Sequence, residues 1–325
     1  MFLLVCVVLL IFPQEATIGA REGLEVAFET VVPAILPFAV FSSAVIYSGA
    51  AVKIGKVLSP LWRFLGLNPF GVVAFISGLL GGYPTGCKAV CDMYEQGIIN
   101  RNSAEKMLSY VNNGGIVFAI NILGNTAFNS SSAGVCAFLS AAVASLIAGC
   151  VFGREKGRSE YSVETKKTPL LGALGKAIAS GGTVVMNIVA SFVVFYALSE
   201  ALKMEKVPLI DGLCEITKGI FYSGKADNLA LATFFFTIGG LGVFAQSAAL
   251  CAKHDLKLNC CIKGKLISAP IAYMMIKFWR SGKEIMLFSY IVLIAVCAAF
   301  VLLRKIKQKQ APGCLLKIIC LQENR

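Results

Sequence analysis

The fold of this chain depends on one run of residues: Ser77-Gly78-Leu79-Leu80-Gly81-Gly82-Tyr83-Pro84-Thr85-Gly86-Cys87-Lys88. The run lies within residues 70–90, an apolar segment otherwise long enough to span a membrane. Glycine is a weak helix former, and proline lacks an amide proton and crowds the preceding turn. We therefore predict that the helix breaks near residues 81–83. It should restart at Pro84, because proline suits the first turn of a helix.

A helix break inside hydrocarbon leaves backbone groups unpaired, which is tolerated only where protein or water satisfies them. In transporters, such a break places the N terminus of a half-helix, the positive end of its dipole, at the binding site. Lys88 follows about one turn into the restarted helix and would favour an anionic group. Two alternatives stay open: the glycines form only a packing kink, and Lys88 forms a structural ion pair with Asp92.

The composition indicates a membrane protein. Hydrophobic residues make up 57% and charged residues 15% of the 325 residues. We predict an all-α polytopic integral membrane protein of the cell membrane, with about 8–10 membrane segments. The net charge of +12 is assigned to lysine and arginine in cytoplasmic loops that face anionic lipid. No basic patch interleaved with aromatic residues is present, so nucleic acid is not an expected partner.

The cysteines and the histidine argue against metal or enzyme chemistry. Twelve cysteines include no CxxC pair, and His254 is the only histidine. We expect no metal site and no cofactor. Cys87 and Cys91 are four residues apart on one helix face, where small apolar packing is the expected role. No HExxH or GxSxG motif occurs, so the chain is not predicted to be an enzyme and no catalytic residue is assigned.

The predicted organisation has two similar halves. It consists of a membrane helix in residues 1–23, a first repeat in 24–152, a basic cytoplasmic linker in 153–169, a second repeat in 170–303 and a basic tail in 304–325. Each half contains, in order, a long span, an interfacial amphipathic helix, a glycine-broken segment, a polar link and further spans. If residues 124–132 lie outside the cell and residues 70–94 form a re-entrant hairpin, the loop charges make the repeats inverted. The same count places the basic tail outside, against the charge rule.

In the first half, residues 24–50 are predicted to form one span kinked at Pro33 and Pro37. Residues 53–68 are predicted to be an interfacial helix, and a helix cap is expected at Asn102 or Ser103. A span over 107–123, a loop over 124–132 and a tightly packed span of small residues over 133–152 complete this half.

The span over 107–123 contains Asn112 and Asn113, which are followed by a glycine pair. Buried amides are unfavourable in a membrane unless they face protein or water. Because asparagine both donates and accepts hydrogen bonds, the pair suits either support of the break at residues 81–86 or contact with a ligand. Both interpretations stay open.

In the second half, residues 170–202 are predicted to form a long helix and 208–225 an interfacial helix. The segment 229–250 carries the pair Gly239 and Gly240, at the place that corresponds to Gly81 and Gly82, and then Gln246. Two interrupted apolar segments in matching positions indicate a binding site at the membrane midplane. Segments 266–279 and 285–303 are the last predicted spans.

Residues 78–120 resemble the nucleoside-recognition "Gate" domain family of bacterial membrane proteins, and within it the sporulation integral membrane proteins. The family pattern is carried by these residues: Gly82, Tyr83, Pro84, Gly86, Lys88, Asn112, Asn113 and Gly114. Its second run is residues 239–246, which end in Gln246. The family often has histidine where this chain has Phe244, which places histidine-dependent chemistry there in doubt.

The resemblance implies a role in forming the spore cortex of a Gram-positive endospore former. It also implies a fold related to the gate regions of nucleoside and ferrous-iron transporters, without establishing a substrate. We expect a permease for a small polar or anionic solute, with a partner-retaining membrane scaffold as the alternative. The expected partners are this solute and membrane lipid, and association with a second copy or with other sporulation membrane proteins is left open.

The predicted substrate-binding or gate residues come from both halves of the chain. They are Gly81, Gly82, Tyr83, Pro84, Thr85, Gly86, Lys88, Asn112, Asn113, Gly239, Gly240 and Gln246.

Overall fold

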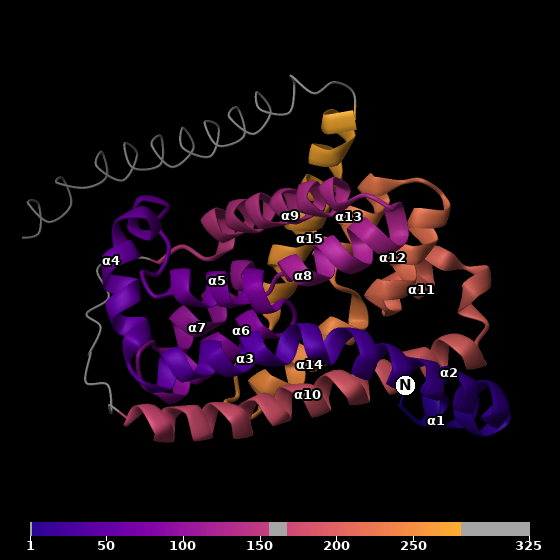
Figure 1. Cartoon of the computed structure of the whole chain (residues 1–325), viewed down its shortest axis with the longest axis horizontal. Coiled ribbons are helices and arrows are strands. Elements are labelled where there is room, and N and C mark those ends of the chain that lie inside the picture. The colour runs from indigo at the N-terminus through magenta and orange to yellow at the C-terminus, as the bar shows by residue number, and fades with distance from the viewer. Residues whose placement is uncertain (1, 156–167, 281–325) are drawn as a thin grey trace, which may run out of the picture. The chain divides into compact units, whose positions relative to one another are not determined.

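A computed structural model describes residues 2–155 and 168–280, and every regular element among them is a helix (Figure 1). Among the described residues, five helical segments are long and apolar enough to cross a membrane: Pro13–Tyr47, Arg101–Ala127, Ser131–Phe152, Leu170–Ala201 and Leu229–Ala252. The prediction of an all-α polytopic membrane protein is therefore confirmed. The chain divides into two compact units, Met1–Lys277 and Phe278–Arg325, and the site described below lies in the first.

The first long helix begins earlier than predicted. After α1 (Phe2–Ile11), the chain forms α2 (Pro13–Val26), a π-helical turn η1 (Ala27–Val31) and α3 (Val32–Tyr47) without a gap. The helix expected from residue 24 thus starts at Pro13, because proline is well tolerated in a first turn. The π turn ends two residues before Pro33, which lacks an amide proton. One continuous span is therefore present, and the kink at Pro33 and Pro37 stays a prediction.

The next elements carry the predicted amphipathic helix and the first break. Helix α4 (Ala50–Phe64) buries Gly55 and Trp62 and exposes Lys53 and Lys56, so its amphipathic character is confirmed. Helices α5 (Gly71–Gly81) and α6 (Thr85–Glu95) follow, and then α7 (Arg101–Val111). The cap of α7 is Asn100, whose side chain accepts from the Ser103 amide at 2.9 Å, rather than the predicted residue 102 or 103.

The span predicted over 107–123 is itself broken. It consists of α7, four non-helical residues, the short α8 (Ile116–Phe118) and the π-helical η2 (Ala119–Ala127). The helix therefore extends into the predicted loop 124–132, which shrinks to the residues before α9 (Ser131–Phe152). Helix α9 contacts α7, η2 and α13, which confirms that this small-residue span packs inside the bundle.

The second half contains more breaks than predicted. Its elements are α10 (Leu170–Ala201), η3 (Met204–Lys206), α11 (Pro208–Cys214), α12 (Ile216–Lys225), α13 (Leu229–Ile238), α14 (Gly240–Ala252) and α15 (Asn259–Arg280). The single interfacial helix predicted over 208–225 is wrong, because Glu215 has an extended backbone and caps a second helix. Three predicted parts lie wholly or mostly outside the described residues: the linker 153–169, the span 285–303 and the tail 304–325. The division of the chain into two repeats stays a prediction.

Helix α10 runs alongside α2 and α3, so the long first helices of both predicted halves pack together (Figure 1). Glycines in α2 allow this approach: a Cβ atom on Gly23 would lie 2.7 Å from the carbonyl oxygen of Phe192. Close backbone packing of this kind favours small residues at helix interfaces in membranes. The pair supports one side of the site, because both α3 and Phe192 line its cavity.

Candidate functional site

The first break lies where the sequence predicted it. Helix α5 ends at Gly81, and Gly82 adopts a left-handed φ of +76°, a conformation that L side chains rarely take. The Gly82 amide donates to the carbonyl of Gly78 at 2.8 Å, and the Thr85 amide donates to the carbonyl of Gly82 at 2.7 Å. Helix α6 begins at Thr85, with Pro84 as the residue before it, one position later than predicted.

The second break, residues 112–115, lies directly against the first. A Cβ atom on Gly82 would lie 2.8 Å from the amide nitrogen of Gly115. A Cβ atom on Gly115 would lie 2.9 Å from the amide nitrogen of Gly82, so glycine is required on both sides. Gly86 packs equally closely, because a Cβ atom there would overlap the carbonyl oxygen of Val111. The two breaks therefore form one joint of backbone in contact with backbone.

Two further breaks occur in the second half. Gly239 and Gly240 separate α13 from α14, with φ angles of +83° and +71°. The other break is the extended Glu215 between α11 and α12. They are in contact, because a Cβ atom on Gly240 would lie 2.9 Å from the carbonyl oxygen of Leu213. The predicted break at residues 239–240 is present, and the break at Glu215 was missed.

Tyr83 connects the first joint to the second half. Its hydroxyl donates to the carbonyl of Thr237 at 2.8 Å and accepts from Nζ of Lys265 at 2.7 Å. The same Nζ donates to the Thr237 carbonyl at 2.9 Å and lies 4.7 Å from the centre of the Tyr83 ring. The tyrosine thus satisfies a carbonyl beside the Gly239 break, and Lys265 holds both groups in place.

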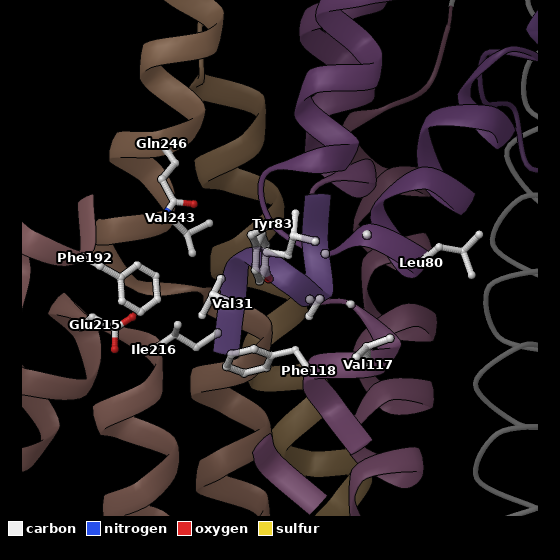
Figure 2. A pocket seen from close by; sticks show the side chains of 16 residues that line it. Val31, Leu80, Tyr83, Val117, Phe118, Phe192, Glu215, Ile216, Val243 and Gln246 are labelled. Carbon is white, nitrogen blue, oxygen red and sulfur yellow. The ribbon is translucent and has the colours of Figure 1, made fainter. Parts of the chain in front are cut away.

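Three of the four breaks, at residues 81–83, at residues 114–115 and at Glu215, border one cavity, which we call the central cavity (Figure 2). The helix α14, which follows the fourth break, also borders it. Its volume is about 40 Å³. Its lining residues come from these three breaks, from η1, α3 and α10, and from the ends of helices next to the breaks: Val31, Ala34, Ile35, Leu80, Gly81, Gly82, Tyr83, Gly114, Gly115, Val117, Phe118, Phe192, Glu215, Ile216, Val243 and Gln246.

Glu215 and Gln246 supply most of the side-chain polarity in this mainly apolar lining. Figure 2 shows Phe192 and Val243 between them. The Oε2 atom of Glu215 caps α12, accepting from the amide of Thr217 at 2.7 Å and from the amide of Lys218 at 3.3 Å. Gln246 is 4% exposed and makes no hydrogen bond to another described residue. A buried amide without a protein partner is suited to bonding water or a solute.

The predicted site residues divide into those that line the cavity and those that support it. Gly81, Gly82, Tyr83 and Gln246 line it. The supporting residues are Pro84, Thr85, Gly86, Asn112, Asn113, Gly239 and Gly240. Glu215 and Lys265 were missed, because Glu215 lies in the predicted interfacial helix 208–225 and Lys265 lies at the end of the basic, polar link that follows residue 250.

The asparagine pair contacts protein. Nδ2 of Asn112 donates to Oγ of Ser247 in α14 at 2.9 Å, and Nδ2 of Asn113 donates to the carbonyl of Tyr110 at 2.8 Å. Asn113 therefore satisfies a carbonyl at the end of α7, and Asn112 ties the second break to α14. These contacts support the second break, whereas neither side chain bonds to residues 81–86, so the predicted role of the pair at that first break stays a prediction.

Lys88 lies away from the central cavity. It forms a buried ion pair with Asp92, whose Oδ2 accepts from Oγ of Ser43 at 2.7 Å and whose Oδ1 accepts from the Tyr47 hydroxyl at 2.9 Å. Both charged residues border a second space of about 200 Å³, which we call the polar cavity. Its lining residues are Lys88, Cys91, Asp92, Glu95, Ser180, Thr183, Leu250, Lys253 and His254.

Comparison with known proteins gives a distant relative. The chain is 21% identical to the sporulation integral membrane protein YlbJ of Bacillus subtilis (strain 168) over an alignment of 332 positions. The alignment covers 86% of this chain and 81% of that protein. No family model and no solved structure matches the chain. Together with the five apolar helices, the similarity establishes a multi-pass membrane protein. Assignment to the Gate domain family stays a prediction.

Proposed function

From the similarity to YlbJ, we propose that this chain is a multi-pass membrane protein of sporulation that moves a small polar solute through the central cavity. The first part is supported by the relative's description as a sporulation integral membrane protein. The spore cortex, suggested by the family resemblance, is the proposed process. Transport is supported by one observation: three helix breaks from both halves of the chain border the same cavity, together with α14, the helix that follows the fourth break.

The convergence favours transport because breaks in membrane helices are energetically unfavourable. Each break leaves backbone donors and acceptors that lipid cannot satisfy. Here Tyr83 satisfies the carbonyl of Thr237 and Asn113 satisfies the carbonyl of Tyr110, each beside a break, while Asn112 bonds the hydroxyl of Ser247 in α14. Transporters use such interrupted helices to place polar backbone groups and helix ends around a solute.

The described conformation is closed to a solute. A volume of about 40 Å³ accommodates water but nothing of nucleoside size. Passage therefore requires the breaks to separate, and glycines in left-handed conformations at residues 82, 239 and 240 are the natural hinges. Movement there would widen the cavity without unfolding the helices on either side.

The lining favours a solute that donates hydrogen bonds. Glu215 contributes a carboxylate and Gln246 an amide, whereas no lysine or arginine is among the lining residues. Lys88, the basis of the anionic expectation, borders the other cavity and is paired with Asp92. We therefore propose an uncharged or cationic polar solute in place of an anionic one.

Accessibility of engineered cysteines tests the proposal. In a cysteine-free background, Val117, Val243 and Gln246 are replaced singly by cysteine and treated in intact membranes with a membrane-impermeant thiol reagent. Leu139, which is 45% exposed on α9, is the lipid-facing control. We expect the three cavity positions to react slowly, as the breaks open and admit the reagent, and Leu139→Cys not to react. If all four positions in folded protein stay unlabelled, the breaks are dry packing joints and the scaffold alternative replaces transport.

A further inference from the structure

Three buried thiols from the two halves of the chain meet beside the site. Cys87 and Cys91 lie one turn apart on α6, and Cys251 lies on α14. Their Sγ atoms are all within 4.8 Å of one another, and those of Cys87 and Cys251 are 3.5 Å apart. No sequence motif predicts this group, because 160 residues separate Cys91 from Cys251.

The spacing of the sulfur atoms suits a metal ion. Zinc–thiolate bonds of about 2.3 Å place ligand sulfurs roughly 4 Å apart around a shared ion, which is close to the separations here. Thiolates are soft ligands, and they select d¹⁰ ions such as Cu⁺ and Zn²⁺ over hard cations. All three thiols project from helices held by the surrounding breaks, so the ligand positions exist before the ion binds.

The group also has an entry route. Cys91 lines the polar cavity, which contains lysine, aspartate and histidine side chains and is large enough for water. An ion could therefore reach the thiols from that cavity, and protons released by the thiols could leave through the same water. A water molecule in the cavity would also be available as a further ligand.

We propose that Cys87, Cys91 and Cys251 bind one thiophilic d¹⁰ metal ion, Cu⁺ or Zn²⁺. Three sulfur–metal bonds form, and each thiol gives its proton to water as it becomes a ligand. Cu⁺ suits three-coordinate thiolate binding, whereas Zn²⁺ would add water from the polar cavity as its fourth ligand. The ion would tie α6 to α14, the two helices that restart after the glycine breaks.

Metal titration of the purified full-length chain tests the proposal and does not depend on transport. Reduced, chelator-stripped protein in detergent is titrated anaerobically with Zn²⁺ and separately with Cu⁺, each against a chromogenic chelator. We expect one ion per chain to be withdrawn from the chelator by at least one metal. The ion that the protein withdraws from the chelator is the one that the three thiols prefer. X-ray absorption of the protein loaded with that ion should show sulfur ligands at about 2.2–2.3 Å.

Cys251→Ser removes one ligand with a small change in volume and should abolish this binding, and Cys136→Ser on α9 is the matched control. Helical circular dichroism and size-exclusion chromatography check that each variant is folded. If Cys251→Ser does not fold, Cys87→Ser is titrated in its place and should also fail to bind the ion. The X-ray absorption spectrum of the loaded wild-type chain then identifies the ligands independently. The proposal is overturned if folded, reduced wild-type protein competes for neither ion, or if binding survives the loss of Cys251.

Discussion

The hydroxyl of Tyr83 donates a hydrogen bond to the carbonyl oxygen of Thr237, 2.8 Å away and 154 residues further along the chain. Tyr83 belongs to the first helix break, and Thr237 lies just before the break at Gly239. The bond therefore joins the interrupted segments of the two predicted halves. Nζ of Lys265 donates to both oxygen atoms and fixes their positions.

Tyr83→Phe should destabilise the joint between the halves. The variant keeps the ring but leaves the Thr237 carbonyl and the Lys265 ammonium each with one partner fewer. We expect a loss of about 1–3 kcal/mol, the usual result of leaving a buried polar group unsatisfied. Thermal unfolding in detergent measures it. Tyr222→Phe, at a side chain that is 37% exposed, is the control and should change little. Equal unfolding temperatures for the two variants would contradict the linking role.

Gly82→Ala separates a steric requirement from a conformational one. Alanine at Gly82 must adopt φ +76° and place its Cβ 2.8 Å from the amide nitrogen of Gly115. Alanine at Gly97 adopts φ +70° with no atom within 4 Å. We expect Gly97→Ala to cost about 1–2 kcal/mol and Gly82→Ala about 2–5 kcal/mol. The yield of folded protein and its unfolding temperature check this order. A smaller effect at Gly82 would mean that the two breaks are not in tight contact.

Lys88→Met should lower the amount of folded protein by leaving Asp92 as an unpaired buried charge. Loss of one partner from a buried ion pair typically costs about 3–5 kcal/mol. The double variant Lys88→Met/Asp92→Asn removes both charges and keeps one acceptor oxygen for one of the hydroxyls of Ser43 and Tyr47, while the other hydroxyl can accept from the asparagine Nδ2. We therefore expect the double variant to recover most of the lost stability in the same unfolding assay. If the single variant is as stable as the wild type, Lys88 does not neutralise Asp92.

Glu215→Gln tests the chemistry of the central cavity. Glutamine keeps an oxygen that accepts from the amides of Thr217 and Lys218, so the cap of α12 should survive. If a donor-bearing solute binds the carboxylate, the variant should fold normally and lose most of its function, measured as the yield of heat-resistant spores. Glu215→Ala should in addition lose about 0.5–2 kcal/mol of stability through the cap. Normal spore yield from Glu215→Gln would remove the carboxylate from the proposed site.

Amino-acid types with strong local preferences determined much of this fold. Apolar runs predicted the long helices over 131–152 and 170–201 to within a few residues. Glycine pairs and Pro84 located the breaks near residues 82 and 239, because positive φ angles and missing amide protons act on the backbone wherever the residue lies. Tyr83 in the first break and Gln246 after the second glycine pair were predicted as site residues, and both line the central cavity.

Only the tertiary structure decided which polar groups share a space. Nothing in the sequence distinguishes Glu215 from other acidic residues. It lines the central cavity only because the junction between α11 and α12 lies there. Lys88 could pair with Asp92 or bind a solute, and the hydroxyls of Ser43 and Tyr47 around Asp92 place it in the ion pair. The thiols of Cys91 and Cys251 meet because α6 packs on α14. Such contacts depend on distant elements, since packing and hydrogen bonding act through space whereas residue preferences act along the chain.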